Sequence, residues 1–166
     1  MIKKLYLTGE IDVNAYRRLS KAIHKAYDED FSEVDLVIMS EGGDAYAALA
    51  IHDLINSYDG ILPVNTTGIG LVASAATLIL ASGVKRTLHK NAWVMIHEDT
   101  PPVTGEEKVT DLELAVLHAR RMEDQWNKLL AERTKLSAEE WAGINSVESY
   151  LTPSECLAYG LIDEVV

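Results

Sequence analysis

The stretch Gly68 to Leu80, which reads GIGLVASAATLIL, decides the fold expected for this chain. It follows a strand-like segment at residues 62–67, and its two glycines predict a tight turn from that strand into a helix near Ala73. Ser74 is the one hydroxyl among the small residues of this turn. Free backbone N–H groups and the helix dipole converge at a helix start, so Ser74 is well placed as a nucleophile or as a helix cap.

Two further interpretations of this stretch stay open at this point. Ser74 can be a small residue that allows close helix packing. The stretch also fits the G-x-G-x-x-G/A fingerprint of dinucleotide-binding folds, but that fingerprint needs an acidic residue about twenty positions later to hold a ribose. No acid occurs between Gly60 and Glu98, so the match to a dinucleotide site is weak.

Composition limits the class of protein. The chain has 166 residues, 48% of them hydrophobic, which predicts a single domain, 1–166, with a sizeable core. Its formal net charge of −11 disfavours nucleic acid and anionic membranes as partners. The single cysteine, Cys156, excludes an intrachain disulfide and fits a reducing cytoplasm. We expect no metal and no cofactor, because the histidines lack metal-ligand spacing and no P-loop motif occurs.

Apolar spacing predicts strands alternating with helices. Strands are expected at 5–8, 34–39 and 62–67, with two more between 84 and 97. This order is typical of a mostly parallel sheet, in which active groups collect at the carboxyl ends of the strands. Ser74, His97 and the pair Gly42-Gly43 all stand at such ends. A Gly-Gly pair there exposes N–H groups suited to an oxyanion, although a plain turn would use the same residues.

The C-terminal half is expected to be helical. A long helix from about 108 to 134 follows an irregular segment that contains Pro101-Pro102. Its apolar stripe includes Leu112, Val116, Met122, Trp126 and Leu129. This stripe exceeds what one small domain can cover, which invites an oligomer contact. Capping boxes at Ser137–Glu140 and Thr152–Glu155 predict two short helices, and a terminal strand follows Gly160.

Four segments together resemble the ClpP family of serine peptidases, and they occur in the family's order over nearly the whole chain: Ile38–Gly43, Val72–Ala76, Val94–His97 and Tyr159–Asp163. The resemblance implies the α/β fold of the ClpP/crotonase type. This fold is a spiral of ββα units with a mostly parallel sheet and a long helix that protrudes after the catalytic histidine.

The same resemblance implies roles for individual residues. Ser74 is the nucleophile, His97 is the general base, and the N–H groups of Gly43 and Ala75 form the oxyanion hole. A neutral imidazole can take the serine proton, and two aimed N–H donors can stabilise the tetrahedral oxyanion. The implied activity is therefore that of a serine endopeptidase.

The acid of the triad falls on Glu148, where an aspartate is usual in the family. Glutamate is longer by one methylene but orients the imidazole in some hydrolases. Glu98, Asp99 and Asp163 are the other carboxylates that could serve, although Asp163 is expected to be a structural partner in the closing turn. The substrate-binding segment implied by the resemblance contains Gly42, Asp44 and Ala45.

The resemblance implies a cytoplasmic peptidase that cuts peptides or unfolded polypeptides inside a homo-oligomeric ring of about six or seven subunits, served by a separate AAA+ unfoldase. Pro101-Pro102 replaces family glycines in a segment that pairs with substrate and stacks rings, which predicts an isolated ring. Met1 lies almost on the first strand and leaves little for the axial loops that meet an unfoldase. The alternatives are a capsid- or scaffold-processing peptidase, a catalytically weak structural subunit of a mixed ring, and an acyl-CoA enzyme of the crotonase type.

Overall fold

The computed structural model describes residues 1–98 and 108–166, so Asp99 and Pro101-Pro102 lie outside the described residues. The strands are β1 (Ile2–Thr8), β2 (Glu33–Ser40), β3 (Val64–Ala73), β4 (Arg86–Leu88), β5 (Trp93–Ile96), β6 (Ser149–Leu151) and β7 (Glu164–Val165). The helices are α1 (Val13–Asp28), α2 (Ala45–Ser57), α3 (Ala75–Ala81), α4 (Val109–Arg133), α5 (Ala138–Asn145) and α6 (Pro153–Tyr159).

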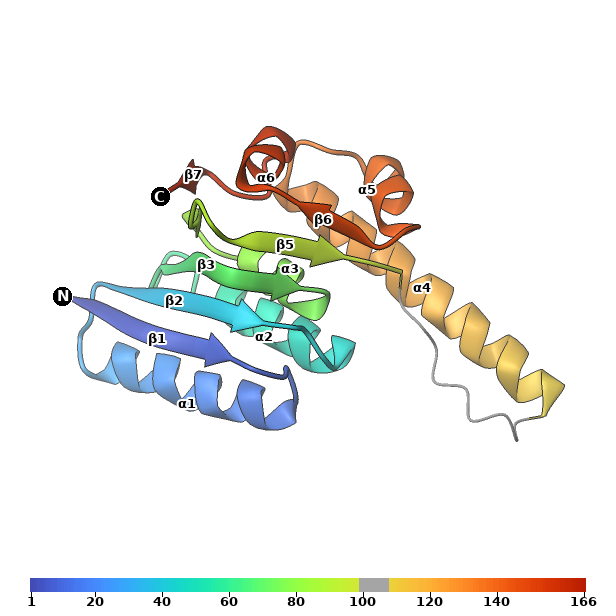
Figure 1. Ribbon diagram of the computed structural model, residues 1–166. Coiled ribbons are helices and arrows are strands. Elements are labelled where there is room, and N and C mark those ends of the chain that lie inside the picture. Colours follow the sequence, from blue (N-terminus) through green and yellow to red (C-terminus); the bar gives the residue numbers. More distant parts are fainter. Residues whose placement is uncertain (99–107) are drawn as a thin grey trace.

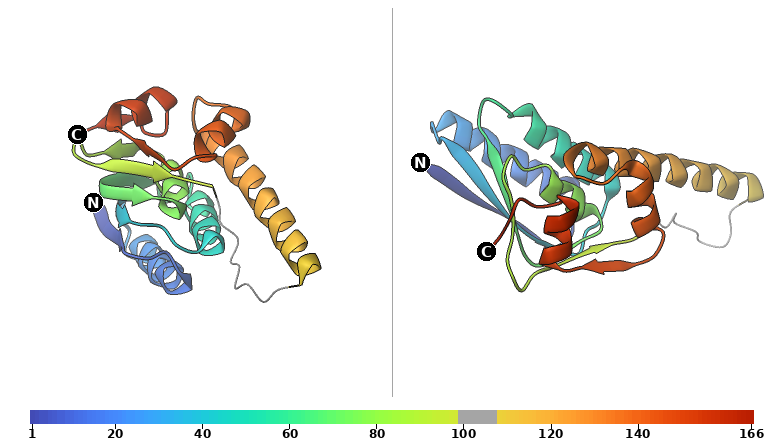
Figure 2. Two further views of the ribbon diagram at one scale, coloured as in Figure 1. Left: turned by 45° about the vertical axis from the view of Figure 1, so that its right-hand side comes forward. Right: turned by 90° about the horizontal axis from the view of Figure 1, so that it is seen from above.

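Within the described residues, the strands form one sheet in the order β1-β2-β3-β4-β7, with β5 beside β3 and β6 beside β5. The pairs are parallel except for β5 with β6, which is antiparallel. Figure 1 and Figure 2 show α1, α2 and α3 on one side of this sheet. Helical crossovers between parallel strands bring the carboxyl ends of β1, β2, β3 and β5 to one edge of the sheet, as the sequence predicted.

The strand β3 is longer than predicted. Gly68 and Gly70 lie inside it, and the strand continues to Ala73. Beyond Ile38 the pairing of β3 with β2 shifts register, and Gly70 adopts a φ of 58° at this bulge. The first part of β3 pairs with β4 and the later part pairs with β5. The prediction of a turn at the glycines was therefore wrong: they bend a strand, and the chain turns into the helix at Ser74.

The core lies between the sheet and the helices that cover it. All seven residues of α3 are buried, which explains its almost uniformly apolar sequence. The largest fully buried side chains come from the sheet and from most of the helices, and they include Ile11, Ile23, Leu36, Ile38, Ile51, Leu78, Leu130 and Trp141. Two predicted capping boxes, those that begin α5 and α6, are present.

His52 is a buried polar residue on α2 whose ring is held on both sides. Its Nδ1 lies 2.7 Å from Ser82 Oγ, and its Nε2 lies 2.9 Å from Asn56 Nδ2. Ser82 Oγ donates to the carbonyl oxygen of Leu78, so it accepts from Nδ1–H, and Nε2 accepts from the Asn56 amide. This network needs a neutral ring. Burial lowers the pKa of His52 below its ordinary value, in agreement with the network.

Two arginines join the C-terminal elements to the sheet. Arg133, the last residue of α4, donates to the carbonyl oxygens of residues 81–83 at the end of α3. Arg86 donates to the carbonyl oxygen of Gly160 and forms an ion pair with Asp163. Burial raises the pKa of Asp163, but hydrogen bonds from Arg86 outweigh it and hold that pKa below its ordinary value. Asp163 thus has the structural role expected of it, at the amino ends of β4 and β7.

The N-terminal half of α4 extends beyond the sheet (Figure 1). Of its 25 residues, only Asn127 and Leu130 are fully buried, and Val116 of the apolar stripe is 42% exposed. Near this half, the Tyr46 hydroxyl on α2 forms a hydrogen bond with the ring of His118. The domain therefore leaves part of the apolar stripe uncovered, as predicted. None of the helices in 1–98 and 108–166 combines the length and apolar composition needed to cross a membrane.

Candidate active site

Ser74 occupies a strained turn between β3 and α3. Its φ is 52° and its ψ is −122°, a conformation that residues with a Cβ rarely adopt. The backbone N–H of Ser74 donates to the carbonyl oxygen of Met95 at 2.7 Å, which fastens the turn to β5. Ser74 occupies the N-cap position of α3, but its side chain makes no capping hydrogen bond, so the prediction that its hydroxyl caps the helix was wrong. The turn instead presents the hydroxyl at the edge of the sheet.

His97 follows β5 and meets Ser74 at that edge. Because Ala73 pairs with Met95 in the parallel ladder of β3 and β5, the residues that follow the two strands emerge side by side. The Nε2 atom of His97 lies 2.8 Å from the Oγ atom of Ser74. An imidazole with its proton on Nδ1 can accept the hydroxyl proton at this distance. The structure thus brings together the predicted nucleophile and base.

Two glycines precede α2 in conformations that only glycine adopts easily. Gly42 has a φ of 100° and Gly43 a φ of 147°. A Cβ on Gly42 would lie 2.7 Å from the Cβ of Ser74, and one on Gly43 would lie 2.4 Å from the carbonyl oxygen of Ile11. The plain-turn interpretation does not require so close an approach to Ser74. The pair is therefore needed to bring this backbone against the serine.

Two backbone N–H groups beside Ser74 are available to a ligand. The N–H of Ile11 donates to the carbonyl oxygen of Gly42, and the carbonyl oxygen of Ile11 accepts from the N–H of Asp44. In this pairing the N–H of Gly43 points away from Ile11. Ala75 is the first residue of α3, where an N–H has no acceptor within the helix. Gly43 and Ala75 line the same cavity as Ser74. This arrangement suits the predicted oxyanion hole.

The other predicted substrate-binding residues differ in what they contact. The carboxylate of Asp44 caps α2, accepting from the N–H of Ala47 at 2.7 Å. Ala45 lines the cavity beside Ser74. Asp44 thus has a structural contact that accounts for its presence, and substrate binding by these residues stays a prediction.

Glu148 lies next to His97 in the backbone but is not joined to it by a hydrogen bond. The antiparallel register pairs Ile96 with Ser149, so Glu148 stands opposite His97 one step beyond the ladder. Its exposed carboxylate instead interacts with the hydroxyl of Tyr150, and this contact raises the pKa of Tyr150 above its ordinary value. Among residues 1–98 and 108–166, no carboxylate is hydrogen-bonded to His97. The third member of the triad stays a prediction.

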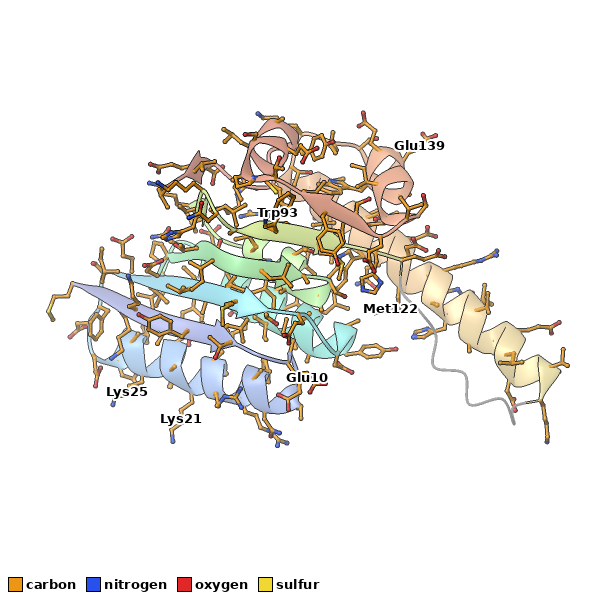
Figure 3. The ribbon with its side chains drawn as sticks, in the orientation of Figure 1. Glu10, Lys21, Lys25, Trp93, Met122 and Glu139 are labelled. Atoms are coloured by element: carbon orange, nitrogen blue, oxygen red, sulfur yellow. The ribbon has the colours of Figure 1, made fainter. Side chains whose placement is uncertain are left out.

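A cavity of about 70 Å³ opens beside Ser74. Its walls include Thr77 of α3, Ile96 of β5, Met122 and Trp126 of α4, and Asn145 at the end of α5. Figure 3 labels Met122 where α4 passes the carboxyl end of β5. The sequence placed Met122 and Trp126 on the apolar stripe, whose spacing is the same for a core and for a cavity wall. No sequence signal pointed to Asn145, which the fold brings in from α5.

The described residues offer no competing reactive centre. The thiol of Cys156 is buried, and burial raises its pKa to about 12, so it is not a nucleophile at neutral pH. Within 1–98 and 108–166, no group of three or more metal-ligating side chains is close enough to hold an ion. Among the described residues, the contact of Ser74 with His97 is therefore the candidate reactive centre.

Comparison with known proteins shows the family and the fold of the chain. A sequence model of the Clp protease family matches residues 2–166. Among solved structures, the chain is similar to a mutant of ClpP1 from Listeria monocytogenes, with a TM-score of 0.88 and 26% sequence identity. The match covers 99% of this chain and 91% of the Listeria chain. The α/β fold with its mostly parallel sheet and long helix is thereby confirmed.

Proposed function

The chain belongs to the Clp protease family, and on that premise we propose that it is a serine endopeptidase that hydrolyses peptide bonds through Ser74 and His97. The observation that carries this proposal is the 2.8 Å contact between Ser74 Oγ and His97 Nε2. It occurs beside two N–H donors and a cavity large enough for a side chain. Nucleophile, base, oxyanion donors and substrate pocket are the parts that acyl transfer needs.

The proposed reaction follows from this arrangement. Ser74 Oγ attacks the carbonyl carbon of the scissile bond while its proton passes to His97 Nε2. The N–H groups of Gly43 and Ala75 hold the oxyanion, each contributing about 3 kcal/mol. His97 then gives the proton to the leaving amine, and water hydrolyses the acyl-enzyme by the same steps.

Glu148 is the proposed acid of the triad. Its position opposite His97 would allow a carboxylate to orient the imidazole through Nδ1–H. In the structure its partner is the hydroxyl of Tyr150, so full activity requires the carboxylate to turn from Tyr150 to His97. The longer glutamate side chain supplies the reach for that movement.

The proposal includes a homo-oligomeric ring in the cytoplasm that encloses peptides or unfolded polypeptides, with a separate AAA+ unfoldase as a candidate partner. Two uncovered surfaces support the ring. One is the projecting part of α4, where Val109, Leu114 and Leu117 are exposed. The other is the sheet face opposite α1 to α3, where Tyr6 and Trp93 are exposed, the latter labelled in Figure 3. Large apolar side chains exposed on such surfaces are typical of subunit interfaces.

A second candidate function is a catalytically weak structural subunit of a ring. One observation favours it: among the described residues, no carboxylate orients His97. A serine and histidine alone retain part of the catalysis of a triad but not all of it. The two candidates differ in how fast Ser74 reacts.

Labelling with a serine-directed fluorophosphonate tests the proposal. The native protein should gain one label per chain, mapped to Ser74, and Ser74→Ala should gain none. Ser57→Ala is the matched control, because Ser57 is a serine at the end of α2 whose hydroxyl donates to its own helix. Unchanged labelling of Ser74→Ala would refute the assignment of the nucleophile. An unlabelled native protein in its assembled form would favour the structural subunit.

A further inference from the structure

We propose that the cavity beside Ser74 selects substrates in which the residue before the scissile bond carries a carboxamide, as glutamine does. This inference rests on the proposed peptidase function, because it names the substrate of the same site. The structural basis is a pair of buried, hydrogen-bonded amides: Asn145 lines a cavity whose other walls are largely apolar, and Asn127 is its partner.

The amide pair is buried and joined internally. Asn145 has an exposed fraction of 4% and Asn127 one of 3%. The Nδ2 atom of Asn145 donates to the Oδ1 atom of Asn127 at 2.5 Å. A carboxamide carries two donor hydrogens and an acceptor oxygen, so this bond uses only part of the capacity of each. Buried polar groups cost free energy unless they are hydrogen-bonded.

The unused capacity of Asn145 faces the cavity. Asn145 lines the cavity, and no group in 1–98 or 108–166 donates to its carbonyl oxygen. At the same time, no fully buried side-chain polar atom of the described residues lacks a partner. The oxygen of Asn145 is therefore not sealed in protein. Exchanging O and N in both amides would still present an amide to the cavity, so both assignments give the same polar site.

The size and walls of the cavity favour a side chain with an apolar stem and a polar tip. The cavity of about 70 Å³ is well above the roughly 10–15 Å³ that one water needs, so it can take a side chain of several non-hydrogen atoms. A glutamine side chain has about five non-hydrogen atoms. Ile96, Met122 and Trp126 can cover its methylenes, and its carboxamide can both donate to and accept from Asn145.

Charged side chains of similar length fit less well. A glutamate in the substrate would have to bury its charge among largely apolar walls, in a chain that already carries a net charge of −11. A lysine would donate to Asn145 but would have to bury its charge among apolar walls. Leucine would fill the space and leave the carbonyl oxygen of Asn145 without a donor, which is the costly case for a polar pocket.

The test compares kcat/KM for fluorogenic peptides that differ only in the residue before the scissile bond: glutamine, leucine, glutamate or lysine. The parent protein should prefer glutamine to leucine by about tenfold. The double variant Asn127→Leu/Asn145→Leu removes both amides together, so neither is left unpaired, and should prefer leucine. Asn14→Leu, at an exposed position on α1, is the control and should keep the parental ratio. A ratio within one variant is independent of how much of the protein is folded.

A second variant covers the case in which the double variant does not fold. Asn145→Asp is nearly isosteric and exchanges the amide for a carboxylate, so it should shift the preference from glutamine to lysine. The inference is overturned if the parent prefers leucine or lysine, or if Asn127→Leu/Asn145→Leu keeps the preference for glutamine. In those outcomes the peptidase function stands. If no peptide is cleaved and Ser74 is not labelled by fluorophosphonate, both proposals fail.

Discussion

Replacing Ser74 by glycine should stabilise the protein relative to replacing it by alanine. Ser74 has a φ of 52° and a ψ of −122°, and such a conformation costs a residue with a Cβ about 1–3 kcal/mol. Alanine retains that strain, whereas glycine relieves it. Glycine also gives the unfolded chain more freedom, which costs about 0.4–1 kcal/mol. Both variants lose the contact with His97, so Ser74→Gly should be more stable than Ser74→Ala by about 1 kcal/mol.

Urea unfolding of the two variants at equal protomer concentration measures this difference, and in thermal unfolding it corresponds to about 2–4 °C for a chain of this size. The control pair is Ser57→Gly and Ser57→Ala at the last residue of α2. Among the non-glycine residues of the described chain, only Asp30 and Ser74 have positive φ, so at Ser57 alanine should be the more stable. If Ser74→Ala equals or exceeds Ser74→Gly, the turn is not strained and the argument from its geometry fails.

Three other measurements test the site, a buried histidine and the assembly. His97→Ala should lower the turnover of a small peptide ester about as much as Ser74→Ala, and Glu148→Ala should lower it less, because triad members act as a unit; parental activity in Glu148→Ala would exclude this acid. Because the pKa of His52 is lowered by burial, the unfolded chain binds a proton that the folded chain does not, so stability should fall as pH drops from about 7 through the unfolded value of about 6.5. His52→Gln should flatten that slope in urea midpoints measured at several pH values, and an unchanged slope would assign it to other groups. Sedimentation velocity should give the mass of a single ring; a monomer at micromolar concentration would contradict the ring, and a stable species of twice the mass would contradict the effect proposed for Pro101-Pro102.

The sequence was informative where local chemistry and fold geometry agree. Ser74, His97 and Gly42-Gly43 each follow a strand, and in a parallel sheet the ends of neighbouring strands meet, so their convergence could be predicted. The capping boxes of α5 and α6 were equally readable, because their hydrogen bonds lie within four residues of chain. The location of the turn was not, since Gly68 and Gly70 serve a bulge as well as they serve a turn.

The cavity could not be predicted from the sequence. Met122 and Trp126 follow the helical period whether they cover a core or line a pocket. Asn145 and Asn127 come from different helices, and only the packing of α5 against α4 brings their amides together. Glu148 could be placed beside His97, but its carboxylate can turn either to Tyr150 on β6 or to His97 after β5, and the side-chain rotamer decides between them. Such outcomes are set by tertiary contacts and leave no trace in periodicity.

The contacts of α4 have a mechanical consequence for the serine. At about 1.5 Å per residue, its 25 residues make a rod of about 37 Å whose outer half lies free of the sheet. Its inner half borders both ends of α3: Met122 and Trp126 stand at the cavity where α3 begins, and Arg133 holds the carbonyls where α3 ends. Because α4 lies against α3 and is hydrogen-bonded to its C-terminal end, we expect the two helices to move together. A partner that displaced the outer end of α4 would therefore change the wall of the cavity beside Ser74 directly, without acting through a loop.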